Sequence, residues 1–183
     1  EVAHRAGTAV GTLYSRFRDK ETFLKTFYDD FFARAAATAD AAFDPARWRR
    51  LPARDLIAAW VALLVRNYGA HRRLLSALLL YVRTHEDPEY RARAVRFNLQ
   101  FVARLRDLIL MHRSQVRHPD PERAIVVGLL MVDGAAKESI LFGETRPESL
   151  SVPDSALIAE LTRGFCAYLG VEPVRPPRRR RKA

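Results

Sequence analysis

Apolar side chains recur at intervals of three and four residues along nearly the whole chain, which is the periodicity of amphipathic helices. No stretch alternates persuasively between apolar and polar residues as a half-buried strand does, and there is no Asn-Gly hairpin turn. Prolines and clusters of Asp and Gly divide the pattern into about six or seven helices. The sequence therefore predicts an all-α fold.

Start and stop signals give the expected bounds of these helices. Residues 1–6 look like the end of a helix stopped by Gly7, and a short helix follows over 9–17. Asp19 is the expected N-cap of a long helix over 20–43, and the segment "FDPARWRRLP" is expected to break it. The remaining helices are expected over 54–68, ended by Gly69, and over 71–85, 89–116, 121–142 and 154–169.

Composition favours a globular protein, because 49% of the 183 residues are apolar and 28% are charged. No apolar run reaches the roughly 18 residues of a membrane span. Cys166 is the only cysteine, so no internal disulfide is possible, and Glu1 is not followed by a secretory leader. These features fit a reducing cytosol and exclude a membrane-spanning protein.

The positive charge is concentrated at the C-terminus. The net charge is +10, and the six basic residues of "VRPPRRRRKA" leave only +4 for the rest of the chain. A Pro/Arg tail cannot pack into a core, so we expect it to be disordered. It is either a solvated end or an accessory contact to nucleic acid.

The stretch "AGTAVGTLYSRF" at 6–17 predicts DNA recognition. A short helix, a glycine-containing turn and a second short helix form a helix-turn-helix, whose second helix enters the major groove. Hydroxyl groups there can bind phosphates or base edges, and the basic side chains can neutralise phosphates. The residues expected to contact DNA are Thr8, Ala9, Val10, Thr12, Tyr14, Ser15, Arg16 and Lys20.

The longer stretch "VAHRAGTAVGTLYSRFRDKETFL" resembles the DNA-reading segment of tetracycline-repressor-type (TetR/AcrR) transcriptional regulators. The positions that match the family's pattern in register are Ala6, Gly7, Gly11, Thr12, Leu13, Tyr14, Phe17, Lys20, Glu21 and Leu24. Ala9 departs from it, since the family usually has a capping serine there, and Thr8 is the nearest replacement. The resemblance implies an all-helical homodimer that binds a palindromic double-stranded operator and is released by a small-molecule inducer. A repressor is the commoner behaviour of the family.

The resemblance also implies a division of the chain. A partial helix-turn-helix domain with a connecting helix is expected over 1–42, a helical ligand-binding and dimerisation domain over 43–171, and a basic tail over 172–183. The family's first helix, which packs on Leu13 and Phe17, would lie upstream of Glu1. We therefore expect that this chain begins inside the DNA-binding domain and, as given, binds operator DNA poorly, because so short a helix is unstable alone.

Polar and aromatic residues on otherwise apolar stripes are the candidates for an inducer pocket. They are Trp60, Asn67, Tyr81, His85, Asn98 and Phe101. The alternative is that the aromatic residues are ordinary core and that His85, beside "EDP", lies in solvent at a helix end.

A stripe of small residues is the candidate dimer interface. Ala124, Gly128, Ala135 and Ser139 fall within about 60° on a helical wheel, which permits close approach of a second helix. The resemblance places this stripe on one of the helices that pair in the family's dimers. The alternative is close packing within the same subunit.

Two other functions compete with a regulator. An enzyme is disfavoured because His71, His85, His112 and His118 lack metal-ligand spacing, and Asp133 with Lys137 makes an ordinary i, i+4 ion pair. We expect no catalysis, no metal and no cofactor. The other alternative is a helical interaction module whose basic tail binds nucleic acid without sequence specificity.

Overall fold

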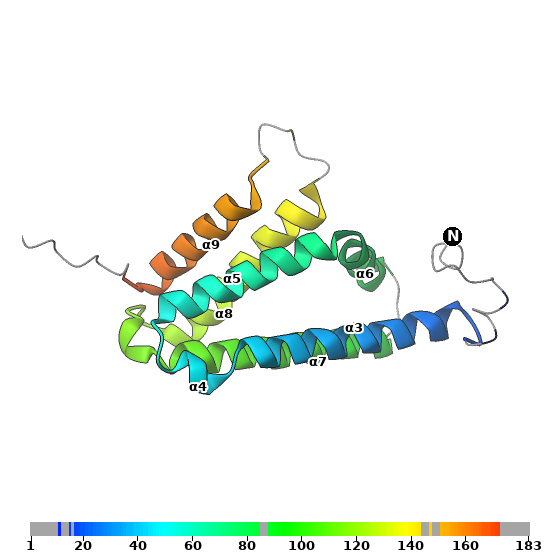
Figure 1. The fold of residues 1–183 in the computed structure, drawn as a ribbon, viewed down its shortest axis with the longest axis horizontal. Helices are drawn as coiled ribbons and strands as arrows, with labels where there is room; N and C mark the ends of the chain where they lie inside the picture. Colours follow the sequence, from blue (N-terminus) through cyan, green and yellow to red (C-terminus); the bar gives the residue numbers. More distant parts are fainter. Residues whose placement is uncertain are drawn as a thin grey trace, which may run out of the picture.

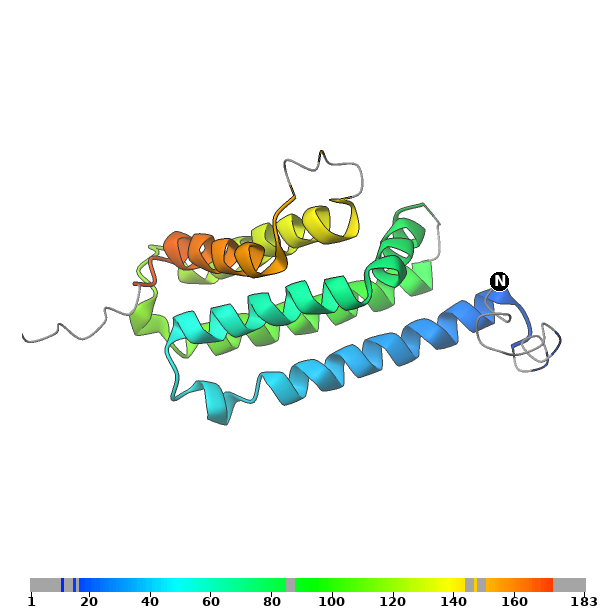
Figure 2. The ribbon, with the colours of Figure 1, turned by 45° about the horizontal axis from the view of Figure 1, so that its top comes forward.

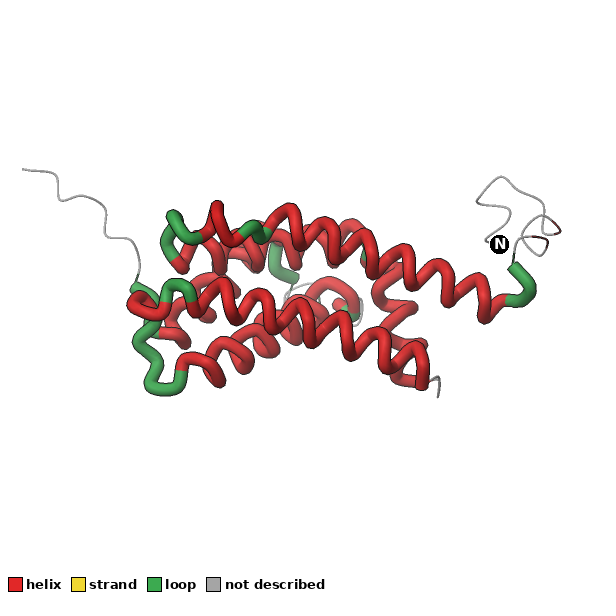
Figure 3. Tube along the Cα trace, turned by 90° about the horizontal axis from the view of Figure 1, so that it is seen from below, coloured by secondary structure: helices red, strands yellow, loops and turns green. Residues whose placement is uncertain are grey.

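The computed structural model describes residues 11, 15, 17–84, 88–143, 147 and 151–172. Within these ranges the chain consists of helices and loops without a β-strand (Figure 3), so the all-α prediction is confirmed. The long helices are α3 (Lys20–Ala42), α5 (Ala53–Ala70), α6 (Arg72–Thr84), α7 (Pro88–Leu110), α8 (Pro121–Ala136) and α9 (Asp154–Leu169). No helix of the described part is long and apolar enough to cross a bilayer.

Helix α5 is the centre of the bundle. It packs on α6, α7, α8 and α9, and its Leu56, Ile57, Val61 and Val65 are completely buried. Helix α9 lies beside both α5 and α8, whereas α3 lies on the far side along α7 (Figures 1 and 2). The first turns of α3 project beyond the end of the bundle (Figure 2).

Helix α3 begins where the sequence predicts. The Asp19 carboxylate accepts a hydrogen bond of 2.7 Å from the backbone N–H of Thr22, which satisfies one of the orphan donors of the first turn. At the other end, the buried Phe43 closes the helix through its own N–H, which donates to the Ala39 carbonyl. A side-chain cap at the first turn and a backbone hydrogen bond at the last thus define the helix locally.

The expected break after α3 contains a short helix of its own, α4 (Pro45–Trp48). Asp44 caps it, and Pro45 occupies a first-turn position where a missing N–H costs nothing. Trp48 is buried and its indole N–H donates to the Ala42 carbonyl at 2.7 Å. The prediction of a plain break was therefore incomplete, because a buried tryptophan holds the segment in place.

Helix α5 also departs from its expected end, because it runs through Gly69 to Ala70. A helical glycine costs only about 1 kcal/mol, which the packing of the preceding turns outweighs.

Helix α7 was expected to reach Val116 but ends at Leu110. A 3₁₀ turn over Arg113–Gln115 follows, and Val116 is buried in an extended conformation. The Gln115 side chain accepts from the Ala53 N–H at 2.9 Å, at the start of α5, which explains why the chain turns here. The prediction was wrong because the apolar periodicity continues beyond Leu110, whereas contacts with α5 end the helix there.

The single helix expected over 121–142 also changes its winding. It is α-helical to Ala136 and continues as a π-helix, η2 (Lys137–Leu141). Such π segments widen a helix and are frequent at functional sites. Helix α9, in contrast, has the predicted bounds and ends at Gly170, whose φ of 67° favours glycine.

Candidate functional site

Helix α3 is held along α7 by ion pairs with a constant offset of 64 residues. Lys25 pairs with Glu89, and Asp29 accepts two hydrogen bonds from Arg93 at 2.5 and 2.6 Å. Further along the two helices, Asp40 pairs with Arg104. From one pair to the next, the residue numbers increase on both helices. The helices are therefore parallel, and these pairs define their register.

Aromatic contacts complete the same interface. The rings of Tyr28 and Tyr90 are 4.3 Å apart, and those of Phe32 and Phe97 are 4.9 Å apart. Burial raises the pKa of Tyr28 above its ordinary value of 10.0, so the phenol is neutral. Among the α3 side chains that the structure describes, only Tyr28 and Ala39 are buried, so the helix rests on the bundle through a narrow strip of contacts.

A cavity of about 480 Å³ lies between α3 and the bundle, a volume typical of small-molecule sites. Helices α3, α5, α6, α7 and α8 all contribute to its wall. The aromatic lining residues are Phe31, Phe32, Trp60, Tyr68, Tyr90, Phe97 and Phe101. Leucines such as Leu63, Leu75, Leu105 and Leu129 line the rest of the apolar wall.

A polar corner interrupts this apolar wall. The Tyr68 hydroxyl donates to one oxygen of Asp133 at 2.5 Å, and the Lys137 ammonium donates to the other oxygen at 2.5 Å. Burial, reinforced by the neighbouring carboxylate, raises the pKa of Tyr68, so its hydroxyl keeps its proton. The predicted Asp133–Lys137 ion pair is therefore present, and it lines a cavity.

Trp60 forms part of the wall between the cavity and α9. Its ring packs edge-on against Phe165 with centroids 5.9 Å apart. Its buried indole N–H has no hydrogen-bond partner among the described residues and no appreciable exposed surface. Trp60 therefore lines the cavity with the apolar surface of its ring, and its indole N–H is not accessible to a ligand.

The structure brings four of the six predicted pocket residues to this one cavity, namely Trp60, Asn67, Asn98 and Phe101. Tyr81 packs beside it, 5.7 Å from the ring of Tyr90, and His85 lies outside the described residues. Sequence reasoning missed the contribution of α3 and the role of Tyr68. No local signal marks them, because their neighbours in the cavity are distant in sequence.

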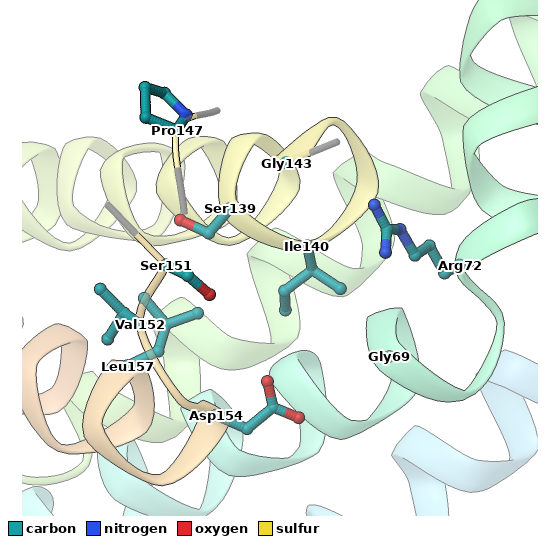
Figure 4. A pocket seen from close by; sticks show the side chains of 10 residues that line it. All are labelled: Gly69, Arg72, Ser139, Ile140, Gly143, Pro147, Ser151, Val152, Asp154 and Leu157. Atoms are coloured by element: carbon teal, nitrogen blue, oxygen red, sulfur yellow. The ribbon is translucent and has the colours of Figure 1, made fainter. Parts of the chain in front are cut away.

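A second hollow, of about 450 Å³, opens at the C-terminal end of α5, beside the start of α9 (Figure 4). Ser139 and Ile140 of the π-helix, Arg72 of α6 and Asp154 of α9 lie on its wall. It is mixed in character and lacks the aromatic surface of the first cavity, which we take as the candidate ligand site.

The predicted dimer stripe divides into two parts. Ala124 is completely buried, and a Cβ on Gly128 would lie 2.0 Å from the Phe165 ring of the same chain. These two positions are packed inside the protomer, which is the alternative that the sequence left open. Ala135 and Ser139 are partly exposed.

The exposed sides of α8 and α9 carry apolar and small residues that the stripe did not include. Met131 on α8 is 57% exposed. The exposed small residues are Gly134 on α8 and Ala156, Ala159, Gly164 and Ala167 on α9. We call this set the α8–α9 outer face. Sequence periodicity did not identify the α8–α9 outer face. An apolar run such as "GLLMV" has apolar residues on every side of the helix, so the sequence does not show which side is exposed.

The predicted DNA contacts fall almost entirely outside the described residues. Thr8, Ala9, Val10, Thr12, Tyr14 and Arg16 are among those not described. Ser15 is helical and exposed, and Lys20 is the first residue of α3. Among the described residues, no group of three or more His, Cys, Asp or Glu side chains is arranged to hold a metal ion.

Comparisons with known proteins support one fold. No protein-family model and no curated protein matches the sequence. The chain is similar in structure to a Rhodococcus sp. protein assigned to the TetR family of transcriptional regulators, with a TM-score of 0.66 and 18% sequence identity. The match covers 92% of this chain and 85% of the Rhodococcus protein. The chain therefore has the all-helical fold of this TetR-family protein.

Proposed function

We propose that the protein is a TetR-type transcriptional regulator that binds a palindromic DNA operator as a homodimer and leaves it when a small molecule enters the cavity. Two independent observations support this. The motif over 6–24 matches the family's DNA-reading segment, and the described chain has the fold of a TetR-family protein at an identity too low for sequence comparison to find.

The position of α3 carries the proposal. This helix begins at Lys20, within the last residues of the motif, and its Phe31, Phe32 and Thr38 line the cavity. A ligand that fills the cavity therefore acts on the helix into which the DNA-reading segment continues. Because α3 is joined to the bundle by a narrow strip of contacts, a preference of the ligand for one α3 position would shift the spacing of two recognition helices.

The α8–α9 outer face supports dimerisation. Small side chains allow a second pair of helices to approach closely, and Met131 supplies apolar area that water otherwise contacts. A two-fold arrangement through this face would present two recognition segments to the two halves of a palindrome. Repression is proposed by analogy with the commoner behaviour of the family.

A gel-shift experiment with DNA flanking the gene tests DNA recognition. The protein is produced as its gene encodes it, and binding is measured at physiological salt against competitor DNA. We expect a competitor-resistant shift. Lys20→Ala should weaken it at every site and reduce the slope of log affinity against log salt by about 1. Lys25→Ala, on the same helix but paired with Glu89, is the matched control and should leave the slope unchanged.

Deletion of residues 173–183 separates this proposal from the alternative of a helical module with a nucleic-acid-binding tail. A helix-turn-helix reader should keep its sequence-specific shift without the tail. Loss of all binding on deletion, with no effect of Lys20→Ala, would show that the basic tail is the functional element.

A further inference from the structure

The charges around the α3 cavity balance one another. Asp133 and Lys137 form an ion pair at 2.5 Å, and the exposed Arg34 of the wall pairs at 2.9 Å with Asp30, which lies beside the cavity on α3 and does not line it. His71 is exposed on the wall and Tyr68 is a neutral donor. The cavity thus offers no unpaired carboxylate, lysine or arginine among its described residues.

This balance disfavours a charged ligand. A cation would have to compete with Lys137, which lies one helical turn from Asp133 and is already bonded to it. An anion that approaches Lys137 would meet the Asp133 carboxylate beside it. Removing a charge from water into a largely apolar cavity without a counterion is costly, so either ligand would lose affinity.

The polar corner nevertheless has hydrogen-bonding capacity to spare. An ammonium group has three N–H donors, and among the described residues one N–H of Lys137 is used, toward Asp133. The Tyr68 oxygen keeps its acceptor lone pairs after donating to Asp133. A hydroxyl or carbonyl oxygen on a ligand can therefore bond at this corner without disturbing the ion pair.

Resting on the function proposed above, we propose that the cavity binds an uncharged, predominantly apolar ring molecule that carries a single hydroxyl or carbonyl oxygen. The rings lie among Phe31, Phe97 and Phe101, and the oxygen lies at the Tyr68–Asp133–Lys137 corner. The rings supply most of the affinity through buried apolar area, and the corner selects by charge.

A matched series of fluorescent probes tests the ligand class on the full chain without DNA. Pyrene, pyrenemethanol, pyrenecarboxylate and pyrenemethylammonium share one apolar scaffold and differ in their polar group. Binding is measured by quenching of tryptophan fluorescence and by calorimetry. Pyrenemethanol should bind about tenfold more tightly than pyrene, as one hydrogen bond to a charged donor provides, and more tightly than either charged probe.

Two substitutions should invert this preference in opposite directions. Lys137→Met leaves the Asp133 carboxylate without its cation, so pyrenemethylammonium should become the tightest probe. Asp133→Asn leaves Lys137 without its anion, so pyrenecarboxylate should become the tightest. Arg123→Met removes the cation of a pair on the protein surface, with Asp120 at the start of α8, and should change nothing. Circular dichroism confirms folding, and either inversion suffices if one variant does not fold.

Tightest binding of a charged probe to the unmodified protein overturns the proposal. So do equal affinities for pyrene and pyrenemethanol, and so does the failure of all probes to bind. These results are distinct from failure of the proposed function, which is decided by the gel shift of the unliganded protein. If pyrenemethanol releases the unmodified protein from operator DNA but does not release Lys137→Met, binding at this corner is linked to the proposed regulation.

Discussion

Gly128 shows how much one residue determines in this protein. A helical glycine normally costs about 1 kcal/mol relative to alanine. Here it allows α8 to approach the Phe165 ring of α9 so closely that a Cβ would lie 2.0 Å from it. The small-residue pattern correctly indicates a close helix contact, but only the structure shows that this neighbour belongs to the same chain.

Gly128→Ala should therefore lower stability, although alanine is the better helix former. Overpacking costs about 1–3 kcal/mol, which outweighs the gain in helix propensity of about 1 kcal/mol. The midpoint of urea unfolding is the measurement. In a Phe165→Leu background the same substitution should cost less, and this non-additivity is the internal control. Equal costs in both backgrounds would contradict the assigned contact.

At the scale of elements, the α3–α7 pair is the interface on which the proposed signal depends. Its ion pairs join residues far apart in the sequence; Lys25 and Glu89, for example, are 64 positions apart. In the sequence each of these residues is therefore indistinguishable from a solvated surface charge. Hydrogen bonds from Lys25 and then Arg93 lower the pKa of Glu89 below its ordinary value of 4.5.

This interface should weaken in acid. Because the folded-state pKa of Glu89 is below the unfolded-state value, its contribution is present above that value and is lost as the pH falls through the folded-state pKa. The melting temperature of Glu89→Gln should be below that of the unmodified protein at about pH 7, and the difference should shrink toward about pH 3. The carboxylate is exposed, so the effect is modest. A difference that does not change with pH would indicate lost packing instead of lost charge.

At the scale of the whole molecule, the arrangement leaves the α8–α9 outer face without a partner in the described chain. Buried residues of the two helices face α5, α7 and each other, so what remains outside is available to a second copy. The apolar exposure of Met131 and the small residues around it are the features expected of a helix-pair interface.

Met131→Asp should convert the proposed dimer into a monomer. The position is 57% exposed in the protomer, so the fold should tolerate the change, whereas a buried unpaired carboxylate is costly at an interface. Sedimentation velocity gives the mass directly. Leu99→Asp, at a 64% exposed position on α7, is the control and should remain dimeric. Dissociation by Leu99→Asp but not by Met131→Asp would place the interface on α7.

The sequence by itself determined the helical class, the N-cap at Asp19 and the bounds of α9, because periodicity and caps act within a few residues. It also identified a set of polar and aromatic positions, four of which share one cavity. Only the tertiary structure decided where α7 ends, which charges pair across 64 residues, and that Asp133 and Lys137 face a cavity with Tyr68. These features depend on contacts between distant segments, and no local pattern contains them.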